Sequence, residues 1–166
     1  FQFTENKKFE CMKKIALLFL TMVTLLSCGN EVEFNTPGFQ GNKDYNLWRA
    51  TYFNATIGTN GMVTITAGNS NESMIFTVVS SNTGTYTLSD ATISKANFVD
   101  FNDTVYSTSN TPDPSVTIYP EIGEIVITES TPGTLSGTFR FNAFTSDGLN
   151  SVGFNEGVFY RVPIIN

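Results

Sequence analysis

The sequence predicts an all-β protein whose single domain is an antiparallel β-sandwich of about eight to ten strands, with a flattened β-barrel as the alternative. Three observations predict this fold. Only 14% of the 166 residues are charged, and Ser, Thr, Asn and Gly are abundant. Short runs of alternating apolar and polar residues are separated by turn residues every ~8–12 positions. After Cys28, no window shows the period of about 3.6 residues that marks an amphipathic helix.

The folded part is predicted to open with a β-meander. Apolar and polar residues alternate at 51–56, 63–67 and 74–78, and turns rich in Gly and Asn at 58–61 and 68–71 separate these runs. Runs joined by such short turns usually pair as neighbouring antiparallel strands.

The second half of the chain is less regular. A polar loop at 102–114, which ends in Pro112-Asp113-Pro114, is expected to cross between two sheets, and this favours the sandwich over the barrel. In the run at 135–143, predicted to be the longest strand, apolar residues at odd positions alternate with polar ones. The other strands of this half are predicted at residues 86–88, 95–101, 116–118, 125–127 and 151–162.

Residues 12–28 have the layout of a bacterial lipoprotein signal peptide. Two lysines precede the run 15–26, in which only two of the 12 residues are polar. A spanning helix needs about 20 apolar residues, so this run is too short to stay as an anchor. It ends in Leu25-Leu26-Ser27-Cys28, which resembles the lipobox. That resemblance implies cleavage between Ser27 and Cys28 and a lipid on the Cys28 sulfur; a plain signal peptide before a chance cysteine is the alternative.

The chain is expected to fall into four segments. Residues 1–11 are interpreted as over-extended translation before the true start at Met12, and 12–27 as the signal peptide. Residues 28–46 are predicted to be a flexible tether, and 47–166 the single β domain. Cys11 then lies outside the protein and Cys28 carries lipid, so no thiol remains. The predicted location is the cell envelope, lipid-anchored to the outer membrane, in either the periplasmic or the surface leaflet.

Four short motifs carry a family resemblance. They are Trp48-Arg49-Ala50-Thr51, Gly84-Thr85-Tyr86, Leu135-Ser136-Gly137-Thr138-Phe139-Arg140-Phe141 and Gly157-Val158-Phe159. In this order, over about residues 47–162, they resemble an uncharacterised Bacteroidota lipoprotein family known as a domain of unknown function. The resemblance implies a secreted β-rich domain and brings no activity.

The composition excludes several kinds of chemistry. The chain has no His, and no thiol is expected in the mature protein, so Ser-His-Asp and Cys-His catalysis and zinc sites built on these residues are excluded. Residues 28–166 hold 5 basic and 13 acidic residues, a net charge of −8, which argues against nucleic acid as a partner. No cofactor is expected, and the protein is predicted not to be an enzyme. A hydrolase using two carboxylates is the remaining catalytic hypothesis.

Three positions are weighed as binding or modification sites. Trp48 is the aromatic residue expected at the rim of the domain, where it could stack on a ligand. Asp103-Thr104-Val105 resembles an O-glycosylation acceptor of Bacteroidota, with Thr104 as the modified residue. Residues 100–103 could offer oxygen ligands to calcium, but their chemistry is better explained as that of a loop.

These observations lead to two functional hypotheses. The first is a non-enzymatic envelope module that binds a glycan or an envelope protein and reaches the membrane through its lipid anchor. The alternative is a lipid-anchored barrel that carries a small apolar ligand in an enclosed pocket.

Overall fold

The computed structural model describes residues 38–117 and 123–165. The predicted signal peptide, the lipobox with Ser27 and Cys28, and the first part of the predicted tether lie outside the described residues. Within the described residues there is no helix, and hence none long and apolar enough to cross a membrane. Strands form most of this part of the chain, so the prediction of an all-β protein is confirmed.

Eleven strands pair into one curled sheet in the described part of the chain. All the pairs between named strands are antiparallel. In chain order the strands are β1 (Phe39–Lys43), β2 (Asn46–Arg49), β3 (Tyr52–Ile57), β4 (Val63–Gly68), β5 (Ser73–Val78), β6 (Gly84–Leu88), β7 (Lys95–Val99), β8 (Val105–Ser107), β9 (Gly123–Ser130), β10 (Thr134–Phe144) and β11 (Ser151–Pro163).

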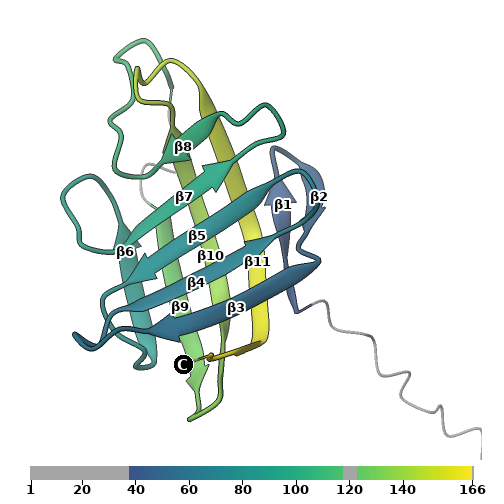
Figure 1. Cartoon of the computed structure of the whole chain (residues 1–166). Helices are drawn as coiled ribbons and strands as arrows, with labels where there is room; N and C mark the ends of the chain where they lie inside the picture. Colours follow the sequence, from purple (N-terminus) through teal and green to yellow (C-terminus); the bar gives the residue numbers. More distant parts are fainter. Residues whose placement is uncertain (1–37, 118–122, 166) are drawn as a thin grey trace, which may run out of the picture. The chain divides into compact units, whose positions relative to one another are not determined.

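The curled sheet forms a half-barrel with two layers. One layer contains β3, β4, β5 and β7, and the other contains β1, β9, β10 and β11, whose strands cross behind the first layer (Figure 1). The short strand β8 joins the layers because it pairs with β7 and, through Ser107 and Phe144, with β10. The chain end returns to β3, where Ile164 makes a parallel bridge to Ala55. The architecture is therefore compatible with both a sandwich and a flattened barrel.

Irregularities in the pairing of β10 and β11 bend the second layer. On β11, Asn155 and Glu156 together lie opposite the single residue Arg140, and the register shifts again between Leu135 and Gly137. Glu156 has a φ of 49°, in the left-handed region that non-glycine residues rarely occupy. Extra residues of this kind increase the local twist and bend of a strand. They allow the longest strands to curl around the core.

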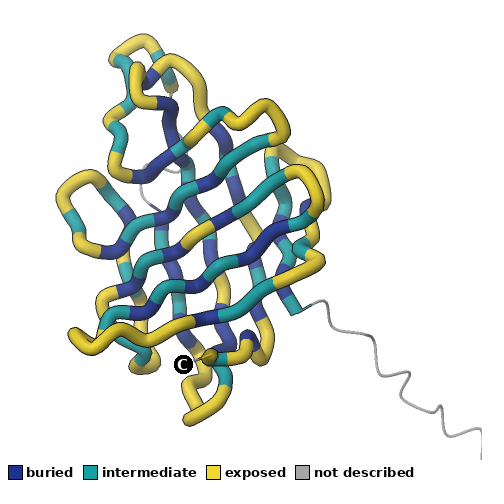
Figure 2. The backbone as a smooth tube through the Cα atoms, viewed as in Figure 1, coloured by how far each residue is buried: buried dark blue, intermediate teal, exposed yellow. Residues whose placement is uncertain are grey.

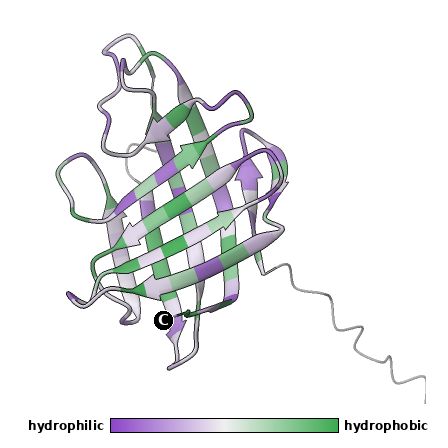
Figure 3. Cartoon of the chain, viewed as in Figure 1, coloured by the Kyte–Doolittle hydropathy of each residue, from purple (hydrophilic) through white to green (hydrophobic). Residues whose placement is uncertain are grey.

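The core between the layers is filled by aromatic rings. Phe76 from the first layer lies 5.0 Å from Phe139 of the second, measured between ring centroids, and Phe141 lies 5.1 Å from Phe154. Buried and more exposed residues alternate along the strands, and most of the buried ones are hydrophobic (Figures 2 and 3). A small apolar ligand, the cargo in the carrier hypothesis, would have to part these rings. That hypothesis stays a prediction.

The predicted boundary between tether and domain is wrong. Residues 28–46 were expected to form the tether, yet Phe39–Lys43 is β1, and β2 begins at Asn46. Phe39 pairs with Phe159 across the sheet and is fully buried. The pattern is hard to see in the sequence because Phe39 is the single large apolar residue of the strand. Its strand structure depends on a partner at the far end of the chain.

The strand predictions are otherwise largely confirmed. Strands β3, β4 and β5 form the expected meander, and the loop at 102–114 does lead from one layer to the other, although it also contains β8. Strand β6 does not extend the meander, because it pairs with β9. Residues 116 and 117 lie outside any strand, while 118–122 fall outside the described residues. The longest strand is β11, not β10.

Candidate functional site

A groove of about 310 Å³ opens on the outer face of β9, β10 and β11, and we call it the outer groove. Along β10, Phe139 and Phe141 are buried in the core, so Thr138 and Arg140, which alternate with them, face outward. The outer groove is lined by Glu124, Thr138, Phe139, Arg140, Glu156, Gly157 and Val158.

Two rows of residues across the strands shape the outer groove. In the first row, Glu124 of β9 pairs with Arg140 of β10, and the irregular pair Asn155 and Glu156 of β11 follows. In the second row, Thr138 of β10 pairs with Val158 of β11. Since neighbouring strands lie about 4.8 Å apart, the first row places three charged side chains side by side, and the second places an apolar surface beside them.

The first row is held together by polar contacts. The Arg140 Nε donates to Glu124 Oε1 at 3.0 Å, with both side chains partly exposed. The Glu156 Oε2 accepts a 2.6 Å hydrogen bond from the Asn42 amide, which comes from β1. Exposed ion pairs contribute little to stability. The main effect of these contacts is to hold two carboxylates and one guanidinium in fixed directions along the groove.

The backbone at Glu156 and Gly157 is unusual for the middle of a strand. Glu156 adopts a left-handed φ, which costs a non-glycine residue on the order of 1 kcal/mol. At Gly157, an added Cβ would lie 2.5 Å from two carbons of the Phe139 ring. Glycine is therefore required at 157, and the bulge directs the Glu156 side chain to the outer groove.

The chemistry open to the outer groove is hydrogen bonding around an apolar floor. Glu124 and Glu156 offer acceptors, while Arg140 and the Thr138 hydroxyl offer donors. The hydrolase hypothesis needs two carboxylates about 5–10 Å apart in one cleft, and the outer groove does contain two carboxylates. The hypothesis therefore stays a prediction.

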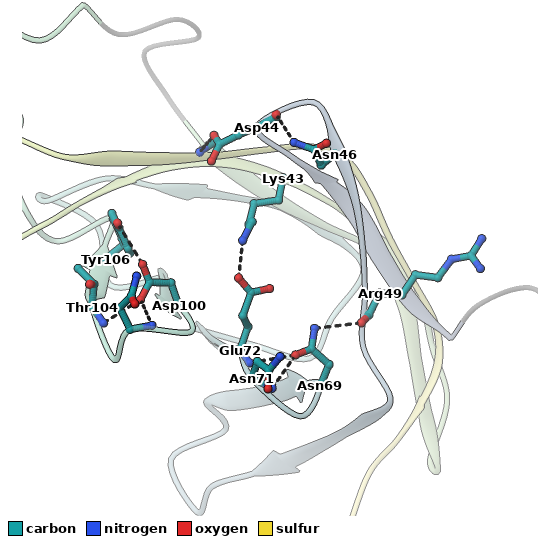
Figure 4. Close-up of polar contacts among 12 residues, drawn as sticks. Lys43, Asp44, Asn46, Arg49, Asn69, Asn71, Glu72, Asp100, Thr104 and Tyr106 are labelled. Atoms are coloured by element: carbon teal, nitrogen blue, oxygen red, sulfur yellow. Dashed lines mark hydrogen bonds and ion pairs between the residues drawn. The ribbon is translucent and has the colours of Figure 1, made fainter.

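A second polar region closes one end of the core, and we call it the mouth cluster: Lys43, Glu72, Asp100 and Tyr106 (Figure 4). Lys43 of β1 forms an ion pair with Glu72, whose side chain is 11% exposed, while that of Lys43 is 24% exposed. The Lys43 Nζ also lies 5.2 Å from the centre of the Phe98 ring. Lys43 and Glu72 thus cover the apolar core at this end, and each neutralises the charge of the other.

Asp100 organises the turn between β7 and β8. Its carboxylate accepts hydrogen bonds from the backbone N–H groups of Asn102, at 2.8 Å, and Thr104, at 3.0 Å. Burial raises the pKa of Asp100, but the bonds from Thr104 and Asn102 outweigh it, so its pKa lies below the usual value. Burial and then the nearby Asp100 charge raise the pKa of Tyr106. These contacts are those of a stable turn.

The prediction that Trp48 lies at the rim of the domain is wrong. Its side chain is 4% exposed and belongs to the core. It packs edge-on against Phe39, at 6.2 Å between ring centroids, and against Phe154, at 5.8 Å. Its Nε1 is buried without a hydrogen-bond partner. The domain begins earlier than the sequence predicts: Trp48 is part of β2, and β1, which precedes it, pairs with β2 through Gly41 and Trp48.

The other predicted positions lie on the β7–β8 turn or outside the described residues. Thr104 is half-buried in that turn, and its glycosylation stays a prediction. Among the described residues, no group of three or more His, Cys, Asp or Glu side chains could hold a metal ion. One Asp100 oxygen already accepts from two backbone N–H groups, which supports the loop interpretation of residues 100–103 over the calcium one. Ser27 and Cys28 belong to the part not described.

The sequence interpretation missed the outer groove. Neither Glu124 nor Glu156 belongs to a motif in the sequence, and no local pattern shows that three strands bring them together. One signal was available, because Gly157 interrupts an otherwise regular strand pattern, and a glycine within a strand often marks a bulge.

A family model matches most of the chain. Residues 35–163 match the domain of unknown function DUF6252. The curated proteins give no match, and neither do the solved structures. The match covers all eleven described strands, from β1 to β11. The chain therefore belongs to the DUF6252 family.

Proposed function

We propose that this protein is an outer-membrane lipoprotein whose β domain is a non-enzymatic module that binds a glycan or an envelope protein. The anchor is the lipid on Cys28, added after cleavage behind Ser27. The resemblance to lipoproteins of the Bacteroidota supports this address, and the DUF6252 match is compatible with it without adding an activity.

The observation that carries the binding role is the outer groove. Its charged side chains are held in place by contacts across the four adjoining strands β1, β11, β10 and β9. Glu156 keeps its direction at the cost of a strained backbone. Strained backbone in a folded domain is often retained for function. The composition supports a binding role over catalysis, because the sequence lacks His altogether and the mature chain is expected to lack a free thiol.

The anchor is tested by replacing the modified sulfur. We expect the wild-type chain to fractionate with membranes and to have an intact mass that exceeds the polypeptide cut before Cys28 by the mass of its acyl chains. In Cys28→Ser the added mass should be lost. Ser27→Ala is the matched control, because it keeps a small residue before the cysteine. If Cys28→Ser keeps the membrane fractionation and the mass of the wild type, the anchor proposal is wrong.

The binding role is tested with the full chain and its own cell envelope. Wild-type protein in vesicles should be retained by isolated envelope material, and Glu156→Gln should be retained less. Digestion of the envelope with protease or with glycosidases then tells a protein partner from a glycan. Equal retention of the wild type, Glu156→Gln and empty vesicles would remove the binding role.

A further inference from the structure

We infer that the outer groove is a saccharide subsite, which takes one or two rings of a neutral oligosaccharide. This inference rests on the proposed function and deepens it, since it names the glycan as the partner and places the contact on β9, β10 and β11. It depends on the size of the groove, on its pairing of an apolar surface with a polar row, and on the alternation of acceptors and a donor along that row.

The size and openness of the groove suit part of a chain. Its volume of about 310 Å³ lies at the lower end of the ~300–1,000 Å³ range of small-molecule sites. The groove lies along the outer face of a sheet and is open to solvent, so a ring inside it can continue into further rings on either side. An enclosed pocket would instead select a free small molecule.

The two rows match the two kinds of surface on a sugar ring. A pyranose has an apolar face of C–H groups and a rim of hydroxyls. Thr138 of β10 and Val158 of β11 pair directly across the strands, and their uncharged side chains supply a surface for the C–H face of the ring. The charged row faces the rim of hydroxyls, with acceptors on Glu124 and Glu156 and a donor on Arg140 between them.

The charge pattern disfavours an anionic ligand, and it disfavours a cationic ligand that spans the whole row. An anionic ligand would meet two carboxylates and a guanidinium that is already bonded to Glu124. A cationic ligand that lay along the row would meet the guanidinium between the carboxylates. A hydroxyl group both donates and accepts, so a row in which acceptors alternate with a donor can bond several hydroxyls at once.

The groove is organised before a ligand arrives. Asn42 holds the Glu156 carboxylate, and Arg140 holds that of Glu124. Glycine at position 156 would relieve the left-handed backbone, yet the chain has a glutamate there. Binding to such a fixed site loses little conformational entropy.

The test is calorimetric titration of the full chain, extracted in a polyoxyethylene detergent whose headgroup carries no sugar. The probes are cellotetraose, maltotetraose, mannotetraose and chitotetraose, each up to about 10 mM. We expect at least one to bind, and Glu124→Gln and Glu156→Gln each to weaken that binding about tenfold, the effect of losing a charged hydrogen bond. Glu129→Gln, on β9 but outside the groove, is the matched control and should bind as the wild type does.

A second variant separates binding from folding. Glu156→Gly removes the carboxylate and relieves the backbone, so we expect it to lose the same binding while its thermal midpoint does not fall. The inference is overturned if no tetrasaccharide binds, or if binding survives both Glu→Gln changes. It is also overturned if the bound tetrasaccharide is hydrolysed in a Glu156-dependent way, because the groove would then be an active site. If no tetrasaccharide binds but protease-sensitive envelope retention persists, the proposed function stands with a protein partner.

Discussion

Gly157 of β11 connects the outer groove to the core, and Gly157→Ala tests this packing. The added Cβ would lie 2.5 Å from the Phe139 ring, closer than carbon atoms can approach. The ring has little room to move, because its centroid lies 5.2 Å from that of Phe39 and 5.0 Å from that of Phe76. Overpacking a filled core costs about 1–3 kcal/mol. We expect that loss in the free energy of unfolding.

The assay is urea unfolding followed by the fluorescence of Trp48, the single tryptophan of the chain, which is buried among the same rings. A loss of about 1–3 kcal/mol corresponds to a midpoint lower by about 1 M urea, or to a thermal midpoint lower by several degrees. Gly133→Ala is the control. Nothing lies within 4 Å of the Cβ it would add, and its backbone is not in the left-handed region.

An unfolding midpoint for Gly157→Ala equal to that of Gly133→Ala would contradict this packing. The Phe139 ring would then not occupy the space beside Gly157, and the core would be looser than the ring distances indicate. The double variant Gly157→Ala/Phe139→Leu adds a check. Its loss should be smaller than the summed losses of the single variants, because the smaller side chain makes room for the methyl group.

Three further predictions concern the mouth cluster and Trp48. Glu72→Gln should lower the free energy of unfolding by about 1.5–3 kcal/mol in the same urea assay, as expected when a partly buried charged hydrogen bond is lost. The double variant Glu72→Gln/Lys43→Met should recover part of the lost stability. Because the folded pKa of Asp100 lies below its ordinary value of 3.8, Asp100 stabilises the fold above that pH, and the stabilisation is lost as the pH falls through the lower folded value. Asp100→Asn should therefore be less stable than the wild type at pH 7, and the difference should shrink toward pH 3; a difference independent of pH would contradict this. Trp48 fluorescence in the native protein should resist quenching by iodide, and quenching as strong as in urea would contradict its burial.

Local signals were enough for the parts of the fold that depend on local sequence. The meander of β3, β4 and β5 was predictable because its strands are joined by turns rich in Gly and Asn, which set the pairing of neighbours. The alternation along 135–143 predicted which side chains of β10 face the core, and the structure agrees. In each case the residues that decide the outcome lie within a few positions of one another.

The candidate site could not be predicted in the same way. Asn42 and Glu156 are hydrogen-bonded although 114 residues separate them in the sequence. The bulge at Glu156 shifts the register of β11 against both β1 and β10, which are also distant in the sequence. The burial of Trp48 likewise depends on β1, whose order comes from pairing with β11. The alternation of apolar and polar residues and the positions of turn residues do not show which distant strands pair.

The sequence alone therefore determined the all-β class, the meander, the inward face of β10 and the absence of His-based chemistry, because these follow from residue types and short periods. The tertiary structure decided where the domain begins, which side of it holds Trp48, and that Glu124, Arg140 and Glu156 form one groove. The physical reason is that register between distant strands is set by the packing of the shared aromatic core. That register also decides which side chains lie side by side on the outer face of the sheet, independently of the residues next to them in the sequence.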